Sequence, residues 1–259
     1  MNADLLIRPC HGFEELAACV QTQVDVWGYT EGDVIPRRLF VVAQKIGGQV
    51  IGAFDLGRSS APQGDASSLV GFAMSLPGVR HGQAYLHSHR LAVLPDYRNR
   101  GLGRKLKLAQ REEALERAVD RMEWTFDPLE IKNAYLNIHK LGVIVRTYIP
   151  NFYGVSSSRL QGGLPTDRLL AEWPMKSKRV EAILSGNHSP LPEIQETIVV
   201  PGSIREWKEL PARRADALRV QASNRERFER AFSQGLTVVA FTKDTEGSGI
   251  FQLGTWTDS

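Results

Sequence analysis

The stretch from Leu91 to Lys105 constrains the fold of this chain more than any other. It reads LAVLPDYRNRGLGRK: an apolar run that stops at Pro95, a polar turn with glycines at positions 101 and 103, and the start of a helical pattern. Glycines let the backbone approach a ligand closely, and a helix that begins there presents unpaired N–H groups and the positive end of its dipole. The sequence therefore predicts a strand, an anion-binding turn and a helix, in that order.

Basic residues crowd this turn, which favours a phosphate or pyrophosphate over a lone carboxylate. They are Arg98, Arg100, Arg104, Lys105 and Lys107. A dinucleotide-binding fold also sets glycines between a strand and a helix, but it needs a third glycine where this chain has Leu106. It also needs an acidic residue at the end of the next strand, whereas Asp120 precedes that strand. The dinucleotide interpretation is therefore poor.

The order of strand, Arg-x-x-Gly-x-Gly and helix closely resembles the acyl-CoA-binding motif of the GNAT superfamily of N-acyltransferases. Arg98, Gly101 and Gly103 fall on the family's Gln/Arg, Gly and Gly/Ala positions. An ordinary turn before a solvated basic helix is the simpler alternative, but the lead-in, the arginine and the helical pattern together favour CoA. The resemblance implies that main-chain amides of the turn hold the pyrophosphate and that the preceding strand pairs with the pantetheine arm. The cofactor-binding residues it implies here are Leu91, Ala92, Val93, Arg98, Asn99, Arg100, Gly101, Leu102, Gly103 and Arg104.

The resemblance also implies an α+β fold, three layers α/β/α around a mixed, mostly antiparallel sheet, over residues 1–175. Hydrophobic periodicity agrees with this order of elements. It predicts strands over 5–8, 39–45, 50–57, 70–74, 81–95 and 123–126, and helices over 13–27, 102–122 and 130–141. The strands 39–45 and 50–57 are predicted to form a hairpin across Gly47 and Gly48.

Residues 176–259 are predicted to form a separate C-terminal α+β lobe. A strand, helices, a strand and a hairpin follow one another here as they do over residues 5–57, and Ile198–Pro201 echoes Leu6–Pro9. One hypothesis is a degenerate half-repeat that extends the sheet or forms a dimer contact, and a chance echo is the other. Because no second Arg-x-x-Gly-x-Gly occurs, we expect this lobe to bind no CoA of its own.

Two histidines lie on the predicted strand before the turn. Alternation puts His87, His89, Leu91 and Val93 on one face unless a bulge intervenes. Imidazole suits removal of a proton from an amine, so His89 is the first candidate for a general base and His87 the second. Supporting the strand or binding substrate is the alternative role for both. The resemblance implies an oxyanion donor among the main-chain N–H groups near Ala92 and Val93.

The helix predicted over 130–141 departs from the family pattern. The family often carries a tyrosine four residues before the capping glycine, where it protonates the departing CoA thiolate. This chain has Ile138 four residues before Gly142, so that assignment fails. Asn133 and Asn137 are expected on one helical face, either bonding to the pantetheine arm or simply exposed.

The segment 146–168 is the candidate acceptor site. Its aromatic, proline and hydrogen-bonding residues suit a substrate pocket, although a well-packed loop is the alternative. The candidate substrate-binding residues are Arg146, Tyr148, Asn151, Tyr153 and Arg168, of which either arginine suits an acceptor carboxylate. This block and Trp124–Leu129 resemble a poorly characterised bacterial subgroup of the family, some members of which are linked to N-succinylation of amino acids.

Composition limits the remaining classes. The charge of +3 comes from basic residues interleaved with acidic ones, which requires no nucleic-acid partner. No apolar stretch approaches the roughly 18 residues of a membrane span, and the N-terminus lacks a signal-peptide pattern. The two cysteines, Cys10 and Cys19, have no metal-like second pair, so we expect buried free thiols, no bound metal and a cytoplasmic protein.

These observations predict a GNAT-type N-acyltransferase. It would move an acetyl or succinyl-type group from acyl-CoA to a primary amine of a small molecule, with an amino acid as one candidate, by direct attack in a ternary complex. A catalytically weak CoA-binding regulatory module and a protein lysine or N-terminal acetyltransferase are the alternatives. The sequence leaves open whether the chain forms a homodimer.

Overall fold

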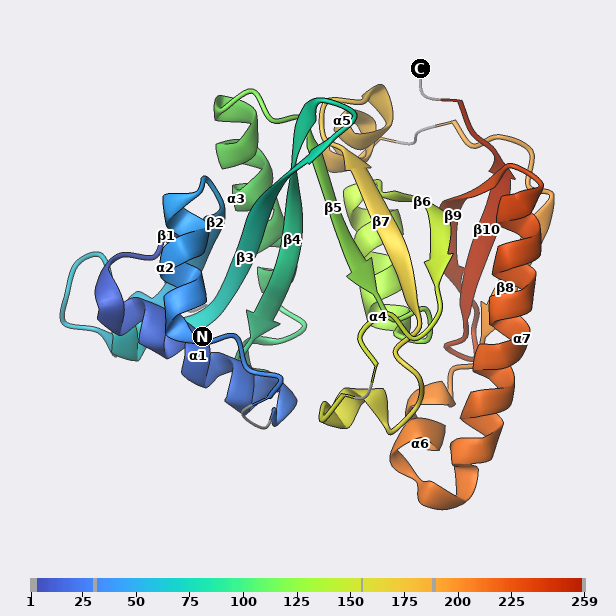
Figure 1. Cartoon of the computed structure of the whole chain (residues 1–259), viewed down its shortest axis with the longest axis horizontal. Coiled ribbons are helices and arrows are strands. Elements are labelled where there is room, and N and C mark those ends of the chain that lie inside the picture. The colour runs from blue at the N-terminus through green and yellow to red at the C-terminus, as the bar shows by residue number, and fades with distance from the viewer. Residues whose placement is uncertain (1–3, 30–31, 155, 188–189, 258–259) are drawn as a thin grey trace. The chain divides into compact units, whose positions relative to one another are not determined.

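The structure is a computed structural model that describes residues 4–29, 32–154, 156–187 and 190–257 (Figure 1). The chain divides into two compact units, Met1–Met122 and Glu123–Ser259. This division falls inside the range predicted for the GNAT domain. The predicted boundary between residues 175 and 176 stays a prediction.

An antiparallel sheet forms the centre of the first unit. Its strands are β1 (Leu5–Pro9), β2 (Gln49–Asp55), β3 (Leu69–Arg80) and β4 (Gln83–Val93), paired in that order. His81 and Gly82 join β3 to β4 with φ of 51° and 74°. Two successive positive φ values are typical of the tight hairpin turn whose twist matches that of the strands. The strand predicted to lead into the anion-binding turn is thus confirmed as β4.

Helices cover both faces of this sheet. They are α1 (Gly12–Trp27) and α2 (Arg37–Lys45) on one face and α3 (Leu102–Glu116) on the other. Because side chains alternate along a strand, β2 sends Val50 and Phe54 toward α1 and α2, and Ile51 and Ala53 toward α3. The first unit therefore has the predicted three-layer α/β/α arrangement.

The strand predicted over residues 39–45, and with it the hairpin across Gly47 and Gly48, is wrong. These residues form α2, in which Phe40 and Ala43 are fully buried while Val41 and Val42 are 37% and 47% exposed. Burial of residues three apart is the pattern of a helix lying on a sheet. Packing of Phe40 and Ala43 outweighs the strand preference of the two valines.

The second unit contains a sheet in the order β5-β7-β6-β9-β10-β8. The strands are β5 (Arg121–Phe126), β6 (Ile144–Ile149), β7 (Arg168–Pro174), β8 (Glu196–Val200), β9 (Leu236–Lys243) and β10 (Gly249–Thr255). The pairs β6–β7, β6–β9, β9–β10 and β10–β8 are antiparallel. The C-terminal strands therefore extend the sheet of β6 and β7.

The two stretches that the half-repeat hypothesis compares pair their strands differently. In the first stretch, β1 pairs with β2, which is the next strand along the chain. In the second, β8 pairs with β10 and not with β9, the next strand along the chain. The order of elements is similar in the two halves, but their topology differs.

Helices α5 (Lys178–Leu184), α6 (Ile204–Glu209) and α7 (Arg214–Ser233) belong to the second unit, and α7 lies along its C-terminal strands in Figure 1. The ring of Phe228 on α7 packs 5.7 Å from Tyr148 of β6 and 5.2 Å from Phe251 of β10. The helix predicted over 130–141 consists of α4 (Ile131–Ala134) followed by a π-helical turn, Tyr135–Lys140.

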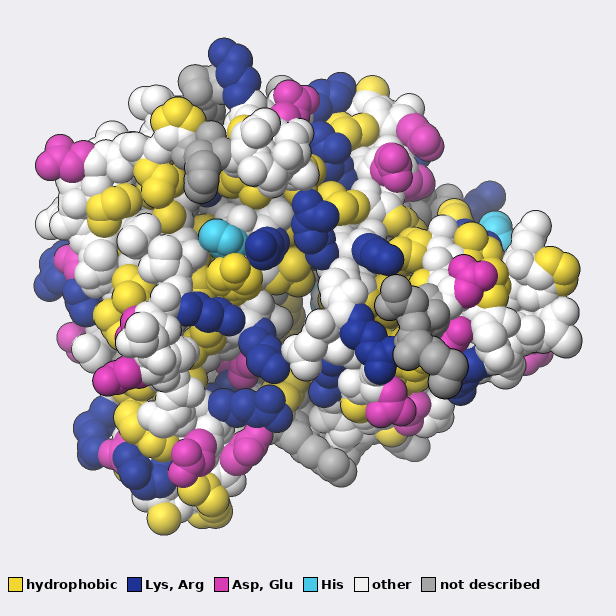
Figure 2. Space-filling view, turned by 180° about the vertical axis from the view of Figure 1, so that it is seen from behind, with side chains coloured by type: hydrophobic (Ala, Val, Ile, Leu, Met, Phe, Trp, Pro, Cys, Tyr) yellow, Lys and Arg dark blue, Asp and Glu magenta, His cyan; other side chains and the backbone are white. Residues whose placement is uncertain are grey.

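The surface carries charges of both signs. On the face that Figure 2 shows, Lys and Arg side chains lie among Asp and Glu side chains and hydrophobic ones. Within the described ranges, no helix combines the length and the apolar character needed to cross a bilayer. Cys10 and Cys19 are buried free thiols with their Sγ atoms 3.9 Å apart, as predicted.

Candidate functional site

The turn between β4 and α3 has the geometry of an anion site. Asn99 and Gly101 adopt left-handed φ values of 60° and 76°, and α3 then starts at Leu102. The first helical hydrogen bond runs from Lys105 N to Gly101 O, at 3.1 Å. The N–H groups of residues 102–104 therefore have no acceptor within the helix, and they lie at the positive end of its dipole.

The turn is also open. A Cβ atom placed on Gly101 would meet nothing within 4 Å, and residues 98–101 are exposed. Open space beside amides that have no acceptor within the helix is what a pyrophosphate needs in order to approach the main chain. The residues present therefore fit the phosphate end of an acyl-CoA molecule.

Arg98 holds the turn in place, whereas Arg100 and Lys105 are exposed at the surface. Arg98 donates from Nε to Val93 O at 3.1 Å, so it fixes the turn against the end of β4. The Arg100 guanidinium lies 5.7 Å from the Tyr97 ring, and both Arg100 and Lys105 are exposed beside the amides. These two residues remain available to a ligand on the surface.

Lys107 does not contribute to the anion site, contrary to the sequence prediction. It is 3% exposed, and its Nζ donates to Ser88 Oγ on β4 at 2.7 Å. Ser88 Oγ in turn donates to Gln110 Oε1 at 2.9 Å. Burial holds the pKa of Lys107 well below its usual range. The residue lies on the sheet-facing side of α3, where it ties the helix to β4.

A β-bulge in β4 changes which residues share a face with the histidines. Ser88 pairs with Ser75 and Arg90 pairs with Met74, which leaves His89 as the extra residue. Leu91 and Val93 pack on the α3 side, whereas the rings of His87 and His89 lie 6.1 Å apart. The predicted common face of His87, His89, Leu91 and Val93 is therefore wrong, because the bulge inverts the alternation after His89.

His89, the first candidate for the base, is partly buried. Burial first, then the charge of Arg90 and the neighbouring His87, lower the pKa of His89 to about 4. The Arg90 guanidinium itself lies 5.7 Å from the Trp27 ring and 5.4 Å from the Tyr29 ring. The His89 imidazole is therefore neutral at ordinary pH, which is the form that accepts a proton.

The π-helical turn separates the two asparagines predicted to share a helical face. Asn133 is exposed, while Asn137 is 4% exposed. The extra residue per turn shifts the register after Ala134, so positions four apart no longer coincide. Ile138 is fully buried, and its side chain has no proton to donate. His139 stacks on Tyr135 with ring centroids 4.5 Å apart.

Two of the predicted substrate-binding residues have hydrogen bonds inside the second unit. Tyr148 is 8% exposed, and its hydroxyl donates to Asp167 Oδ2 at 2.6 Å. Asn151 accepts from Thr166 N at 3.2 Å and donates its own N–H to Asp167 Oδ1 at 2.9 Å. These contacts give Tyr148 and Asn151 a part in packing the loop, the alternative that the sequence left open.

Tyr153, Arg168 and Thr125 form a partly exposed polar cluster. The Tyr153 and Thr125 hydroxyls lie 2.9 Å apart, and the Arg168 guanidinium lies 5.4 Å from the Tyr153 ring. Arg168 donates to Asp167 O at 2.7 Å and to Gln161 Oε1 at 3.2 Å, which are both neutral acceptors. Among the described residues, Arg168 forms no ion pair with a carboxylate. Arg146 is the extra residue of a bulge in β6 and is partly exposed.

Three ion pairs that involve buried charged side chains were not predicted from the sequence. Fully buried Asp167 accepts from the Arg225 guanidinium on both oxygens, at 2.8 and 2.7 Å from Nη2. Lys208 Nζ lies 2.9 Å from Asp127 and 2.8 Å from Glu130. The partners are 58, 81 and 78 positions apart, so no local pattern reveals them. In the described part of the chain, no group of three or more His, Cys, Asp or Glu side chains could hold a metal ion.

Comparison with known proteins agrees with this geometry. Residues 35–136 match the sequence model of the acetyltransferase (GNAT) family. No curated protein sequence matched. One similar structure is the NatC complex bound to a Gag peptide and CoA, with 14% identity and a TM-score of 0.50 over 66% of this chain and 98% of that one. Another is a protein from Acinetobacter baylyi described as a putative acetyltransferase, with 17% identity and a TM-score of 0.50 over 68% of this chain and 95% of that one.

The fold, the turn and the family match define the class. Residues 35–136, which include the Arg-x-x-Gly-x-Gly segment, match the acetyltransferase (GNAT) family, so the resemblance predicted from that segment is confirmed.

Proposed function

We propose that this N-acyltransferase acylates the primary amine of a small molecule that also carries a carboxylate, as an amino acid does. The turn at residues 98–104 carries the acyl-CoA half of the proposal. Two left-handed residues, three amides without a helical acceptor and an open Gly101 suit a pyrophosphate. When bound there, acyl-CoA supplies the activated acyl group.

His89 is the proposed proton acceptor. As the amine nitrogen bonds to the acyl carbon and the carbon–sulfur bond breaks, the nitrogen becomes strongly acidic and must lose a proton. A pKa lowered to about 4 makes His89 a weak base, but it keeps the ring neutral and able to accept that proton during attack. The reaction needs no covalent intermediate on the protein, and buried Cys10 and Cys19 take no part.

The leaving thiolate has no side-chain acid in this proposal. Ile138 is buried and apolar, so the position that often holds a tyrosine in the family offers no proton. A thiolate is stable enough in water to leave as an anion near neutral pH, since a free thiol has a pKa near 8.5. Solvent therefore supplies the proton after release.

Arg168 is the proposed partner of the acceptor carboxylate. Its guanidinium is partly exposed, bonds only to neutral acceptors among the described residues and lies beside Tyr153. An arginine whose charge is uncompensated suits recognition of a planar carboxylate. An acetyl or a succinyl-type donor is compatible with this acceptor.

The test is a panel of amines assayed by release of the CoA thiol and by mass spectrometry of the product. The panel contains amino acids, their decarboxylated analogues, and peptides with free lysine or N-terminal amines, each with acetyl-CoA and succinyl-CoA. The proposal expects amino acids to outperform their decarboxylated analogues. Preference for peptides would instead support protein acetylation, and CoA binding without turnover would support the regulatory module.

Arg168→Gln separates acceptor binding from donor binding. The proposal expects it to raise KM for the carboxylated amine by about 10- to 100-fold, as loss of a charged hydrogen bond does, with KM for acyl-CoA unchanged. Arg230→Gln is the matched control. Arg230 is 60% exposed, and its ion pair with Glu196 is long, at 3.7 Å, so its loss should change little. Equal KM values for the carboxylated amine in both variants would remove Arg168 from the acceptor site.

A further inference from the structure

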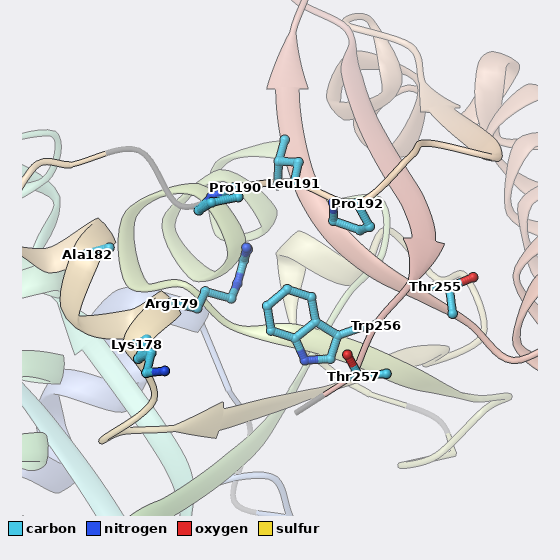
Figure 3. Close-up of a pocket in the computed structure, with 9 residues that line it drawn as sticks. All are labelled: Lys178, Arg179, Ala182, Pro190, Leu191, Pro192, Thr255, Trp256 and Thr257. Atoms are coloured by element: carbon cyan, nitrogen blue, oxygen red, sulfur yellow. The ribbon is translucent and has the colours of Figure 1, made fainter. Parts of the chain in front are cut away.

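A pocket lies within the second unit, and none of the residues that line it is proposed for acyl transfer. It is bordered by α5, by residues 190–192 and by the end of β10 with the two residues after it, and its volume is about 530 Å³ (Figure 3). The residues that line it are Lys178, Arg179, Ala182, Pro190, Leu191, Pro192, Thr255, Trp256 and Thr257. This volume falls in the range of pockets that hold small organic ligands.

Arg179 reaches into this pocket from α5. Figure 3 shows its guanidinium between the Trp256 indole and the segment of Pro190, Leu191 and Pro192. The residue is 5% exposed. Its Nε donates to Gly142 O at 3.1 Å and its Nη2 to Val239 O at 2.5 Å, but its buried Nη1 has no hydrogen-bond partner. Two N–H donors of a fixed guanidinium are thus unused at the pocket.

The charge of Arg179 is uncompensated within the described residues. No Asp or Glu lines the pocket, and Arg179 makes none of the ion pairs found there. Lys208 provides the contrast in the same unit. Burial lowers its pKa, but Asp127 and Glu130 more than offset this, so the pKa of Lys208 is raised. Burial without such partners lowers the pKa of Arg179 to about 10.

The chemistry of the walls restricts what would neutralise this charge. Trp256, whose ring lies 5.3 Å from the Arg179 guanidinium, forms one apolar surface, and Leu191 and two prolines form another. Lys178, the other cation that lines the pocket, is exposed to water, so Arg179 is the buried charge to be matched. A single buried cation matches a single negative charge, since a phosphate dianion would bring a second charge into an apolar site. The apolar walls match an organic body attached to that charge.

We propose that this pocket binds a small organic monocarboxylate. One carboxylate oxygen accepts a hydrogen bond from Arg179 Nη1, and the apolar body of the ligand packs against Trp256 and Leu191. The carboxylate of the ligand would neutralise the buried Arg179 charge, which no described residue of this chain neutralises. The proposal does not depend on the acyl-transfer reaction.

The test is calorimetric titration of the full chain with benzoate and, as a neutral isostere, benzamide. The proposal expects saturable binding of benzoate and none of benzamide. Ala182→Trp fills the pocket from α5 while leaving the hydrogen bonds of Arg179 in place, and it should weaken benzoate binding at least about tenfold. Ala222→Trp, on the exposed surface of α7, is the matched control and should leave it unchanged.

Two further variants keep the outcome decisive. Arg179→Met should abolish benzoate binding, and Ala182→Trp carries the test if that variant does not fold. Arg168→Gln should leave benzoate binding intact, which separates this pocket from the acceptor site. Equal binding of benzamide, equal affinity in Ala182→Trp, or tighter binding of inorganic phosphate than of benzoate would each overturn the proposal.

Discussion

Gly101→Ala tests the anion site at a single backbone position. Gly101 has φ of +76°, in the left-handed region that residues with a Cβ rarely adopt. Since a Cβ atom there would meet nothing within 4 Å, the substitution introduces backbone strain without a clash. The strain costs about 1–2 kcal/mol, and the turn can relieve it only by moving the amides that precede the first bond of α3.

The magnitude follows from those amides. Loss of one hydrogen bond from an N–H group to a charged phosphate costs about 1.5–3 kcal/mol, or roughly 10- to 150-fold in the dissociation constant of CoA. The same strain lowers the melting temperature by about 2–8 °C. We therefore expect a modest loss of stability together with a large loss of CoA affinity.

Gly235→Ala is the matched control. Gly235 has φ of +79°, a Cβ there would also meet nothing within 4 Å, and the residue follows the end of α7. Calorimetric titration with CoA and thermal unfolding of both variants separate strain from binding. Both variants should lose similar stability, and only Gly101→Ala should lose affinity. An unchanged CoA affinity in Gly101→Ala, with the expected drop in melting temperature, would refute the assignment of the turn.

Three other outcomes are expected. His89→Gln should lower kcat by about 10²–10⁴-fold with little change in CoA affinity, and an unaltered kcat would remove His89 as the base. Between pH 6.5 and about 4 the unfolded chain binds a proton at His89 that the folded chain does not, so unfolding free energy should fall by about 2 kcal/mol from pH 7 to pH 5. Urea unfolding of His89→Gln at both pH values should show that this fall in unfolding free energy has disappeared. Lys208→Met should cost about 3–5 kcal/mol, because it leaves buried Asp127 and partly buried Glu130 without their cation. Arg205→Met, at an exposed pair, should cost under about 1 kcal/mol in the same assay.

The sequence predicted the elements whose patterns are local. The alternation that ends at Val93, the glycines of the turn and the apolar period after Leu102 each reside within one segment, so β4, the turn and α3 followed from the residues alone. The run Leu39–Val42 carried conflicting signals, because its valines favour a strand and only burial of Phe40 and Ala43 decides for a helix.

The site was harder to predict because its geometry depends on pairing and burial. The bulge at His89 exists only in relation to β3, and it inverts the face of every later residue in β4. Lys107 looked like a fifth cation of the turn, yet its position on α3 buries it against Ser88. Arg179 gave no sequence signal, since the absence of a carboxylate beside a buried arginine becomes visible only in three dimensions.

Amine-dependent release of the CoA thiol is the most direct test of the central claim. Purified chain is mixed with acyl-CoA and a saturating amino acid, and thiol is followed over time beside Gly101→Ala and Gly235→Ala. We predict sustained release in the wild type and in Gly235→Ala, and a rate at least about tenfold lower in Gly101→Ala at subsaturating acyl-CoA. Binding of CoA by the wild type without thiol release on any amine would contradict the claim that this chain is an acyltransferase.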